Sequence, residues 1–247
     1  MEIKTKAIVM GAASKGEADK RVRLFSVDHG IIEATARGVK KQGAKLAACT
    51  FMFAFVEVVL AEKNGFYTVT SVDLVEPFQE LSLNIEKFEL GSAALEILSE
   101  FVKGQDDCSN SFVEVLNLFK LLCFSDNTDY KLVFSKWIID TLKDAGYKLE
   151  LSKCSVCGRL AESTSNLFMD MESGSVFCGD HKPINGIIRD ITPQIFKVVC
   201  SLPKVKLAEM NGRQLKDEHI KSDDVFDFLI ALSEGIIGKK LKSILHI

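Results

Sequence analysis

Hydrophobic and polar positions alternate in short runs along the first 77 residues. These runs are rich in Val, Ile, Phe, Thr and Tyr, and turn-forming residues such as Asn64-Gly65 separate them. The runs cover residues 4–10, 20–27, 31–39, 51–61 and 66–75. Five strands within so short a length, without helical periodicity, predict a small closed or partly open barrel of the OB type.

After Pro77 the apolar residues fall at helical spacing instead. Three amphipathic helices are expected around residues 90–101, 112–122 and 134–142. Two later helices are predicted over residues 192–202, with Thr192 as N-cap, and from about 222 to 245. The fold class is therefore α+β, with an OB-fold domain over residues 1–78 and an α-helical domain over residues 79–247.

Composition places the chain among compact proteins. It has 247 residues, of which 47% are hydrophobic, enough to form a substantial core. The longest apolar run is short and is interrupted by Glu57, and the N-terminus has no basic-then-apolar signal pattern. These observations predict a cytoplasmic protein without a membrane-spanning segment.

The seven cysteines are unevenly spaced, which favours reduced thiols or metal ligation over a disulfide framework. Four residues form a C-x2-C-x20-C-x2-H pattern. They are Cys154, Cys157, Cys178 and His181. A pair of knuckles closing on one ion is the natural interpretation, since zinc takes four such ligands in a tetrahedron. Gly158 and Gly179 are expected to permit tight turns after their cysteines, within a zinc module at about residues 150–184 inserted in the helical domain.

Other interpretations of the cysteine pattern are weaker. Two unrelated pairs of reduced side chains remain an alternative. A redox CxxC lacks a thioredoxin-like strand and helix around it. A catalytic zinc needs an open coordination position, whereas four protein ligands fill the tetrahedron. The phosphate-loop, dinucleotide and G-x-S-x-G signatures are also absent from the sequence, so a non-enzymatic protein is expected.

Charge is distributed unevenly along the chain. The net charge is −3, yet residues 1–45 contain ten Lys/Arg and only five acids. The candidate phosphate-binding residues in this segment are Lys20, Arg21, Arg23, Arg37, Lys40, Lys41 and Lys45. They predict a surface facing nucleic acid, although a solvated barrel exterior gives the same count. Phe25, Phe51, Phe53 and Phe55 are assigned to the core.

With these parts in hand, the chain resembles the bacterial recombination mediator family RecO. The resemblance runs through Gly16-Glu17, Phe25, His29-Gly30 and Arg37-Gly38, which stand in the order that the family has. It continues in "YTVTSVDLVEPF" at residues 67–78 and in "CSVCGR" at residues 154–159. The helical middle of the chain matches by pattern rather than by motif.

The resemblance implies an N-terminal OB-fold, a helical domain and an inserted module with one structural zinc ion per chain. It also implies binding to single- and double-stranded DNA, annealing of complementary strands, and cooperation with RecR in loading RecA onto DNA coated with single-strand DNA-binding protein (SSB). Contact with the C-terminal tail of SSB, a nucleoid-associated location and the absence of covalent chemistry follow from the same resemblance.

The chain departs from the family pattern at two places. Family members that bind zinc often have a cysteine where His181 stands, so His181 is kept as the fourth ligand and Cys200 as a less favoured substitute. Phe51-Met52 replaces the Pro-Phe that often opens the fourth strand, which makes that strand boundary uncertain. Two other function classes remain as alternatives: a scaffold whose barrel docks a protein partner rather than DNA, and a zinc hydrolase.

Overall fold

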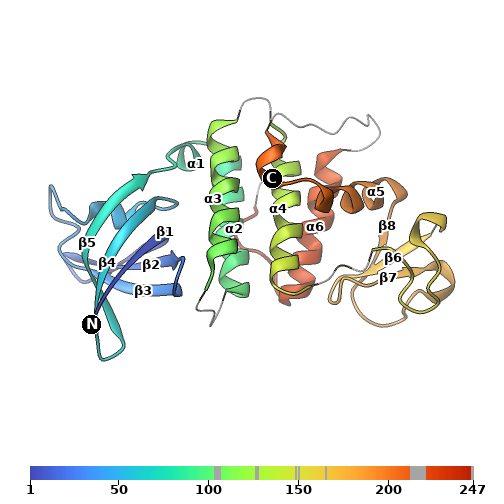
Figure 1. The fold of residues 1–247 in the computed structure, drawn as a ribbon, viewed down its shortest axis with the longest axis horizontal. Coiled ribbons are helices and arrows are strands. Elements are labelled where there is room, and N and C mark those ends of the chain that lie inside the picture. The colour runs from blue at the N-terminus through green and yellow to red at the C-terminus, as the bar shows by residue number, and fades with distance from the viewer. Residues whose placement is uncertain are drawn as a thin grey trace. The chain divides into compact units, whose positions relative to one another are not determined.

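The computed structural model divides the chain into two compact units (Figure 1). The barrel unit comprises Met1–Cys123 with Ser243–Ile247, and the second unit comprises Phe124–Lys242. The structure describes residues 1–102, 107–125, 128–147, 149, 151–164, 166–211 and 221–245. Within those residues, none of the helices has the length and apolar character needed to cross a membrane.

The first 76 residues form a closed five-stranded barrel. Its strands are β1 (Glu2–Lys15), β2 (Asp19–Ser26), β3 (Gly30–Ala36), β4 (Phe55–Lys63) and β5 (Phe66–Glu76). They are joined in the order β1-β2-β3-β5-β4, and β4 closes back on β1. Only the β3–β5 pair is parallel among these strands. This OB-like barrel confirms the predicted fold class.

Alternation along the strands fills the barrel. In β2, Val22 and Leu24 are buried while Arg21 and Arg23 are exposed, as a period of two requires. The core residues of the barrel are Ala7, Val9, Val22, Leu24, Ile32, Ala34, Ala36, Val39, Cys49, Ala54, Val56, Val58, Leu60 and Val69. A short 3-10 helix, η1 (Ala47–Thr50), carries Cys49 into this core from the β3–β4 connection.

The fourth strand begins later than its apolar run suggests. Phe51 is 51% exposed, and β4 starts only at Phe55, so the prediction that Phe51 belongs to a strand and to the core is wrong. The cause is Phe53, whose φ of 71° breaks the extended backbone. Its buried ring packs against Gly91, where an added Cβ would lie 3.0 Å from the ring.

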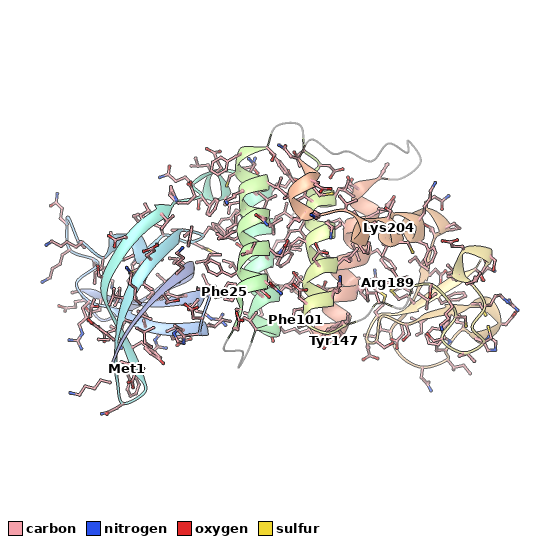
Figure 2. The ribbon with its side chains drawn as sticks, in the orientation of Figure 1. Met1, Phe25, Phe101, Tyr147, Arg189 and Lys204 are labelled. Carbon is pink, nitrogen blue, oxygen red and sulfur yellow. The ribbon has the colours of Figure 1, made fainter. Side chains whose placement is uncertain are left out.

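Three helices pack with the barrel in the same unit. They are α1 (Glu80–Leu83), α2 (Ile85–Phe101) and α3 (Ser109–Phe124). Phe25, labelled in Figure 2, lies 5.6 Å from Phe112 of α3 between ring centroids, and Phe53 lies 5.6 Å from Phe119. Helices α1–α3 thus belong to the same compact unit as the barrel strands. A domain boundary at residue 78 stays a prediction.

The described part of the second unit contains three α-helices. They are α4 (Tyr130–Asp144), α5 (Pro193–Ser201) and α6 (Ser222–Ile237). Thr192 caps α5 as predicted, since its hydroxyl accepts from the backbone N–H of Ile195 at 3.2 Å. The expectation that the last helix reaches residue 245 is wrong, because Gly238 adopts a left-handed conformation that ends α6. Short 3-10 helices fill the connections: η2 (Ala161–Ser163), η3 (Gly179–His181), η4 (Leu202–Lys204) and η5 (Leu207–Met210).

A small antiparallel sheet lies between α4 and α5 in the sequence. Its strands are β6 (Leu167–Asp170), β7 (Val176–Cys178) and β8 (Ile188–Ile191), in the order β7-β6-β8. We call residues 151–191 the metal module, since β8 pairs with β6 beyond the limit predicted at residue 184. The turn after β6 touches α6 directly: a Cβ at Gly235 would lie 2.3 Å from the carbonyl oxygen of Met171.

Candidate metal centre and basic barrel face

The first cysteine pair lies in a tight turn at the start of the metal module. Lys153 and Leu160 form an isolated bridge, and the N–H of Cys154 donates to the carbonyl of Arg159 at 2.8 Å. The N–H of Gly158 donates back to the carbonyl of Cys154 at 2.9 Å, with φ at 70°. Gly158 therefore permits this turn, as predicted, because left-handed backbone favours glycine.

The second pair lies at the end of β7. Cys178 pairs with Leu167 in the sheet, and η3 then turns the chain so that His181 faces back towards the sulfur. Gly179 has no left-handed φ, and a Cβ there would meet only Asn166 at 3.5 Å. Gly179 is compatible with the expected tight turn, but this 3-10 turn also accommodates other residues.

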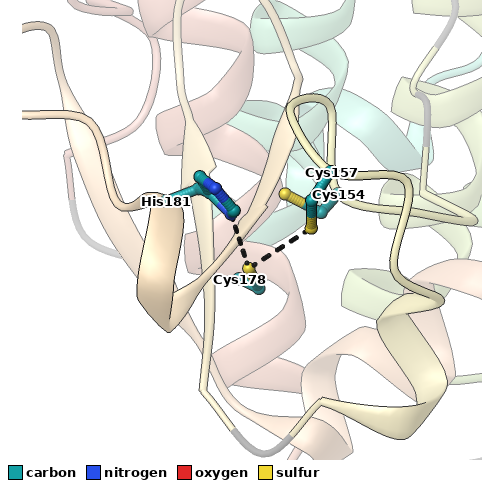
Figure 3. A group of neighbouring side chains, drawn as sticks. All are labelled: Cys154, Cys157, Cys178 and His181. Carbon is teal, nitrogen blue, oxygen red and sulfur yellow. Dashed lines mark hydrogen bonds between the residues drawn. The ribbon is translucent and has the colours of Figure 1, made fainter.

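The four side chains converge from these two turns (Figure 3). Their ligand atoms all lie within 4.8 Å of one another. The Sγ atoms of Cys157 and Cys178 are 3.8 Å apart, and Cys178 Sγ is 3.3 Å from His181 Nδ1. Two sulfurs bound to one tetrahedral zinc ion, each about 2.3 Å from it, stand about 3.8 Å apart. The arrangement thus fits a tetrahedral metal ion with three thiolate ligands and one imidazole ligand.

Backbone amides surround the sulfurs of the cluster. Burial opposes ionisation of Cys154, yet backbone hydrogen bonds from Cys157, Cys178 and Val156 lower its pKa to about 6. For Cys178, burial and the neighbouring thiols raise the pKa, while the backbone N–H of Asp180 acts in the opposite direction. Amide donors to ligand sulfurs are typical of metal knuckles, because they stabilise the negative charge of thiolates.

The two turns are also joined outside the cluster. The N–H of Ser155 donates to the carbonyl of Val176 at 2.9 Å, and Arg159 pairs with Asp180 at 2.9 Å. The Arg159–Asp180 pair is exposed, so it adds little stability by itself. Its effect is to keep the first and second turns in register around the ligand atoms.

The cysteine considered as a substitute ligand lies elsewhere. Cys200 is half-buried on α5 and does not belong to the four-residue cluster. Burial raises its pKa, as it does for Cys49 and Cys123, whose pKa values reach about 11. All three therefore stay protonated near neutral pH, unlike a metal-ligating thiolate.

Arg21 and Arg23 of β2 point outward from the barrel. Arg21 lies opposite Thr35 of β3, and Arg23 lies opposite Glu33. Arg21 and Glu33 make only a long, exposed ion pair of 3.9 Å. Over the described part of the chain, Arg23 makes no ion pair. The outer surface of β2 and β3 therefore presents guanidinium groups to solvent.

Lys15, the last residue of β1, adds a cation that the sequence prediction did not include. Lys15 reaches across to donate to Thr35 Oγ1 at 2.8 Å, which places its ammonium group over the same surface as Arg21. Strand order alone would have indicated this, because the end of β1 pairs with the start of β2. We call Lys15, Arg21 and Arg23, with Glu33 and Thr35 between them, the basic face.

The other predicted basic residues, apart from Lys20 of β2, lie around the turn after β3. Lys40 donates to the carbonyl of Gly16 at 2.7 Å, and Asp19 accepts from the N–H of Gly38 at 2.8 Å, so this turn is fastened to the β1–β2 turn. Arg37, Lys40, Lys41 and Lys45 are all exposed. Lys20 differs, because it is half-buried and its charge acts on Cys49 inside the barrel.

Comparison with protein families accounts for nearly the whole chain. The family model described as "Recombination protein O N terminal" matches residues 1–78, and the one described as "Recombination protein O C terminal" matches residues 82–243. The chain belongs to the RecO family. The N-terminal match covers the barrel with its basic face, and the C-terminal RecO match contains the metal module.

Curated RecO relatives resemble the chain along most of its length. The "DNA repair protein RecO" of Clostridium novyi is 28% identical over 227 residues, covering 90% of this chain and 87% of that protein. The protein of the same name from Syntrophobacter fumaroxidans is 29% identical over 181 residues, covering 72% and 70% respectively. That from Dehalococcoides mccartyi is 28% identical over 179 residues, covering 72% and 70%.

Proposed function

We propose that the chain is a non-enzymatic, DNA-binding mediator of DNA repair and recombination. The observation that carries the proposal is the basic face, where Lys15, Arg21 and Arg23 point outward from two neighbouring strands of an OB-like barrel. Strands 2 and 3 are the usual oligonucleotide surface of OB-folds. The RecO relatives, which are named DNA repair proteins, support the same conclusion.

The cations of the barrel bind phosphates rather than bases. Lys20, Arg21, Arg23, Arg37, Lys40, Lys41 and Lys45, together with Lys15, neutralise the backbone and release its counterions. Such contacts carry no sequence information, so single- and double-stranded DNA are both ligands. Annealing of complementary strands follows, because a cationic surface lowers the repulsion between two polyanions held close together.

The partners are those of recombination mediation. In this proposal the chain acts with RecR in loading RecA onto single-stranded DNA covered by SSB, whose C-terminal tail it contacts. The site of action is the cytoplasm, at the nucleoid. Support for these partners comes from membership of the RecO family, and each is open to direct pull-down with purified components.

The metal module holds one structural zinc ion in this proposal. Cys154, Cys157, Cys178 and His181 supply four ligands, which leaves no coordination position for a substrate. When bound, zinc supplies cross-linking of the two turns rather than activation of water. The residues around it orient and shield the thiolates through backbone amides.

A strand-annealing assay with two matched double variants tests the function. Complementary oligonucleotides coated with SSB are mixed with wild-type protein, with Arg21→Ala/Arg23→Ala, or with Lys4→Ala/Lys6→Ala. The control pair also consists of exposed cations on alternate positions of a barrel strand, but on the β1–β4 side. We expect the wild type and the control to accelerate annealing and the basic-face variant to lose most of the acceleration.

The salt dependence of DNA affinity gives a quantitative test of the same proposal. Removing one phosphate-binding cation lowers the slope of log affinity against log salt by about 0.7 for single strands, so removing both arginines should reduce it by about 1.4. A flat salt response of the wild type, or equal slopes for the two double variants, contradicts the proposal. Salt-insensitive binding to a protein partner without DNA binding would favour the scaffold alternative instead.

A further inference from the structure

The outward positions of β2, β3 and β5 form two rows across the basic face. In the first row, Arg21 of β2 pairs with Thr35 of β3, which pairs with Thr68 of β5. Extending the β3–β5 register by one residue beyond the Ala34–Tyr67 pair brings the outward Glu33 level with the outward Phe66. Since Arg23 pairs with Glu33, the second row runs from Arg23 through Glu33 to Phe66.

Phe66 stands at the edge of the basic face with its ring in solvent. Its side chain is 79% exposed, although a phenylalanine gains free energy when it is buried. The residue paired with it on β4 is the exposed Lys63. Neighbouring strands are about 4.8 Å apart, so Arg23 and Phe66 are about 10 Å apart at the backbone. An aromatic ring therefore stands next to the phosphate-binding cations on the same outer surface.

The turn before Phe66 fixes the position of the ring. Asn64 and Gly65 both have positive φ, at 54° and 78°, which is the two-residue hairpin turn whose twist suits β4 and β5. Glu62 Oε1 accepts from the N–H of Gly65 at 2.8 Å and tightens the turn. The hairpin tip is visible in Figure 1 where β4 runs into β5. The ring is thus presented by an ordered hairpin rather than by a loose loop.

We propose that Phe66 is a stacking platform for an unpaired base of single-stranded DNA bound to the basic face. This inference rests on the proposed DNA-binding function and adds to it a preference for single strands. An exposed ring beside cations matches the two features of single-strand binding, a groove that follows phosphates and an aromatic side chain that stacks a base. Bases inside a duplex are already stacked on each other, so Phe66 has no base to contact there.

The test compares single strands with closed duplexes. Affinity for a thymidine homopolymer and for a duplex whose ends are closed by non-nucleotide linkers is measured by fluorescence anisotropy across a salt series. Removal of one base stack lowers affinity by roughly 5- to 150-fold, so we expect Phe66→Ala to weaken single-strand binding by that factor. Duplex affinity should stay within two-fold of wild type, and the salt slope should not change, because every phosphate-binding cation is still present.

Two further variants sharpen this test. Phe66→Trp should restore single-strand affinity and report stacking by fluorescence quenching, against the constant signal of Trp137, which is fully buried. Phe51→Ala removes a second exposed phenylalanine that lies outside the strands and should bind like wild type. Thermal melting followed by circular dichroism checks that each variant is folded.

The outcomes separate this inference from the proposed function. If wild type binds with a steep salt dependence but Phe66→Ala retains single-strand affinity, the stacking role is overturned and the phosphate-binding role stands. An equal loss on single strands and closed duplexes also overturns it, since stacking on an unpaired base predicts a selective loss. If wild type binds neither DNA at low salt, both proposals fail.

Discussion

The barrel and the metal module are both small β structures, yet they are stabilised in different ways. The barrel closes five long strands around a continuous apolar core. The metal module has three strands of three or four residues, and its two cysteine turns are joined by few backbone bonds. A sheet of this size buries too little apolar surface to be stable alone.

In the metal module, a bound metal ion would take the place that apolar burial has in the barrel. In the barrel, each buried side chain contributes a little, and no single contact is indispensable. In the metal module, four candidate ligands meet between two turns that are otherwise largely exposed, so a bound ion would fix both turns at one point. Loss of the ion should therefore unfold one region and leave the other intact.

Metal removal is expected to have the largest effect. Structural zinc binding contributes about 10–16 kcal/mol in zinc-finger peptides, far more than the metal module can gain from burial. A strong chelator, or Cys154→Ser/Cys157→Ser, should make residues 151–191 exchange amide hydrogens rapidly while strands β1–β5 remain protected. Hydrogen exchange with mass spectrometry measures both regions at once.

The control for metal removal is Cys200→Ser, which changes a thiol of the same unit outside the cluster. It should retain one zinc ion per chain by elemental analysis and the exchange pattern of wild type. If the metal module of the metal-free wild type stayed protected from hydrogen exchange, apolar burial alone would be enough to stabilise it. That result would contradict the difference drawn between the metal module and the barrel.

A cavity in the barrel should have the next largest effect. Leu60→Ala removes a fully buried side chain from β4 and should lower the free energy of unfolding of the barrel by about 2–5 kcal/mol. The neighbouring Val59→Ala, at a half-buried outward position, should cost clearly less. Urea unfolding with and without chelator measures the cost. A cost that depended on zinc would mean that the two regions are not independent.

Substitutions at two glycines within helices, Gly235 of α6 and Gly91 of α2, allow the packing in the two units to be compared. A Cβ at Gly235 would lie 2.3 Å from the backbone carbonyl of Met171, so Gly235→Ala must displace α6 from the metal module. We expect a loss of roughly 1–3 kcal/mol. A Cβ at Gly91 meets the ring of Phe53 at 3.0 Å, and the gain in helix propensity of about 1 kcal/mol offsets that contact.

Urea unfolding of the two alanine variants checks this contrast. Gly91→Ala should stay within about 1 kcal/mol of wild type, because a side chain yields more easily than a carbonyl group. If both substitutions cost the same, the approach of α6 to Met171 is not as close as the structure indicates.

The smallest effect is expected at the cap of α5. Thr192→Ala removes the hydroxyl that accepts from Ile195 N–H and should cost about 1 kcal/mol. Because α5 follows β8 directly, the cost should appear as faster amide exchange in α5 alone, with zinc still bound. Release of zinc by this variant would instead indicate that the cap supports the metal module.

Much of the barrel could be predicted from the sequence because its strands are short apolar runs between turn residues, and burial alternates along β3 and β4. The exception was the start of β4, where Phe51 and Phe53 continue the apolar pattern but a left-handed φ at Phe53 interrupts the strand. Such a backbone reversal depends on the packing against Gly91, which is distant in the sequence. Local periodicity contains no signal for it.

The four residues of the metal centre could be predicted from the sequence, but two residues of the basic barrel surface could not. Cys154, Cys157, Cys178 and His181 were identified by spacing alone, and the structure brings all four together. The strands β6–β8 were not expected, since three or four residues are too few to establish a period. Lys15 and Phe66 were overlooked, because their place beside Arg21 and Arg23 depends on which strands pair.

The bond between α2 and the segment after α6 bears on how the chain folds during synthesis. Ser243 donates to Glu96 Oε2 through its N–H at 3.0 Å and through its hydroxyl at 2.7 Å, across 147 residues. At about 5–20 residues per second, a ribosome needs roughly 7–30 s to make the residues between them. Through that interval the nascent barrel unit lacks these two hydrogen bonds, which form only after Ser243 has been made.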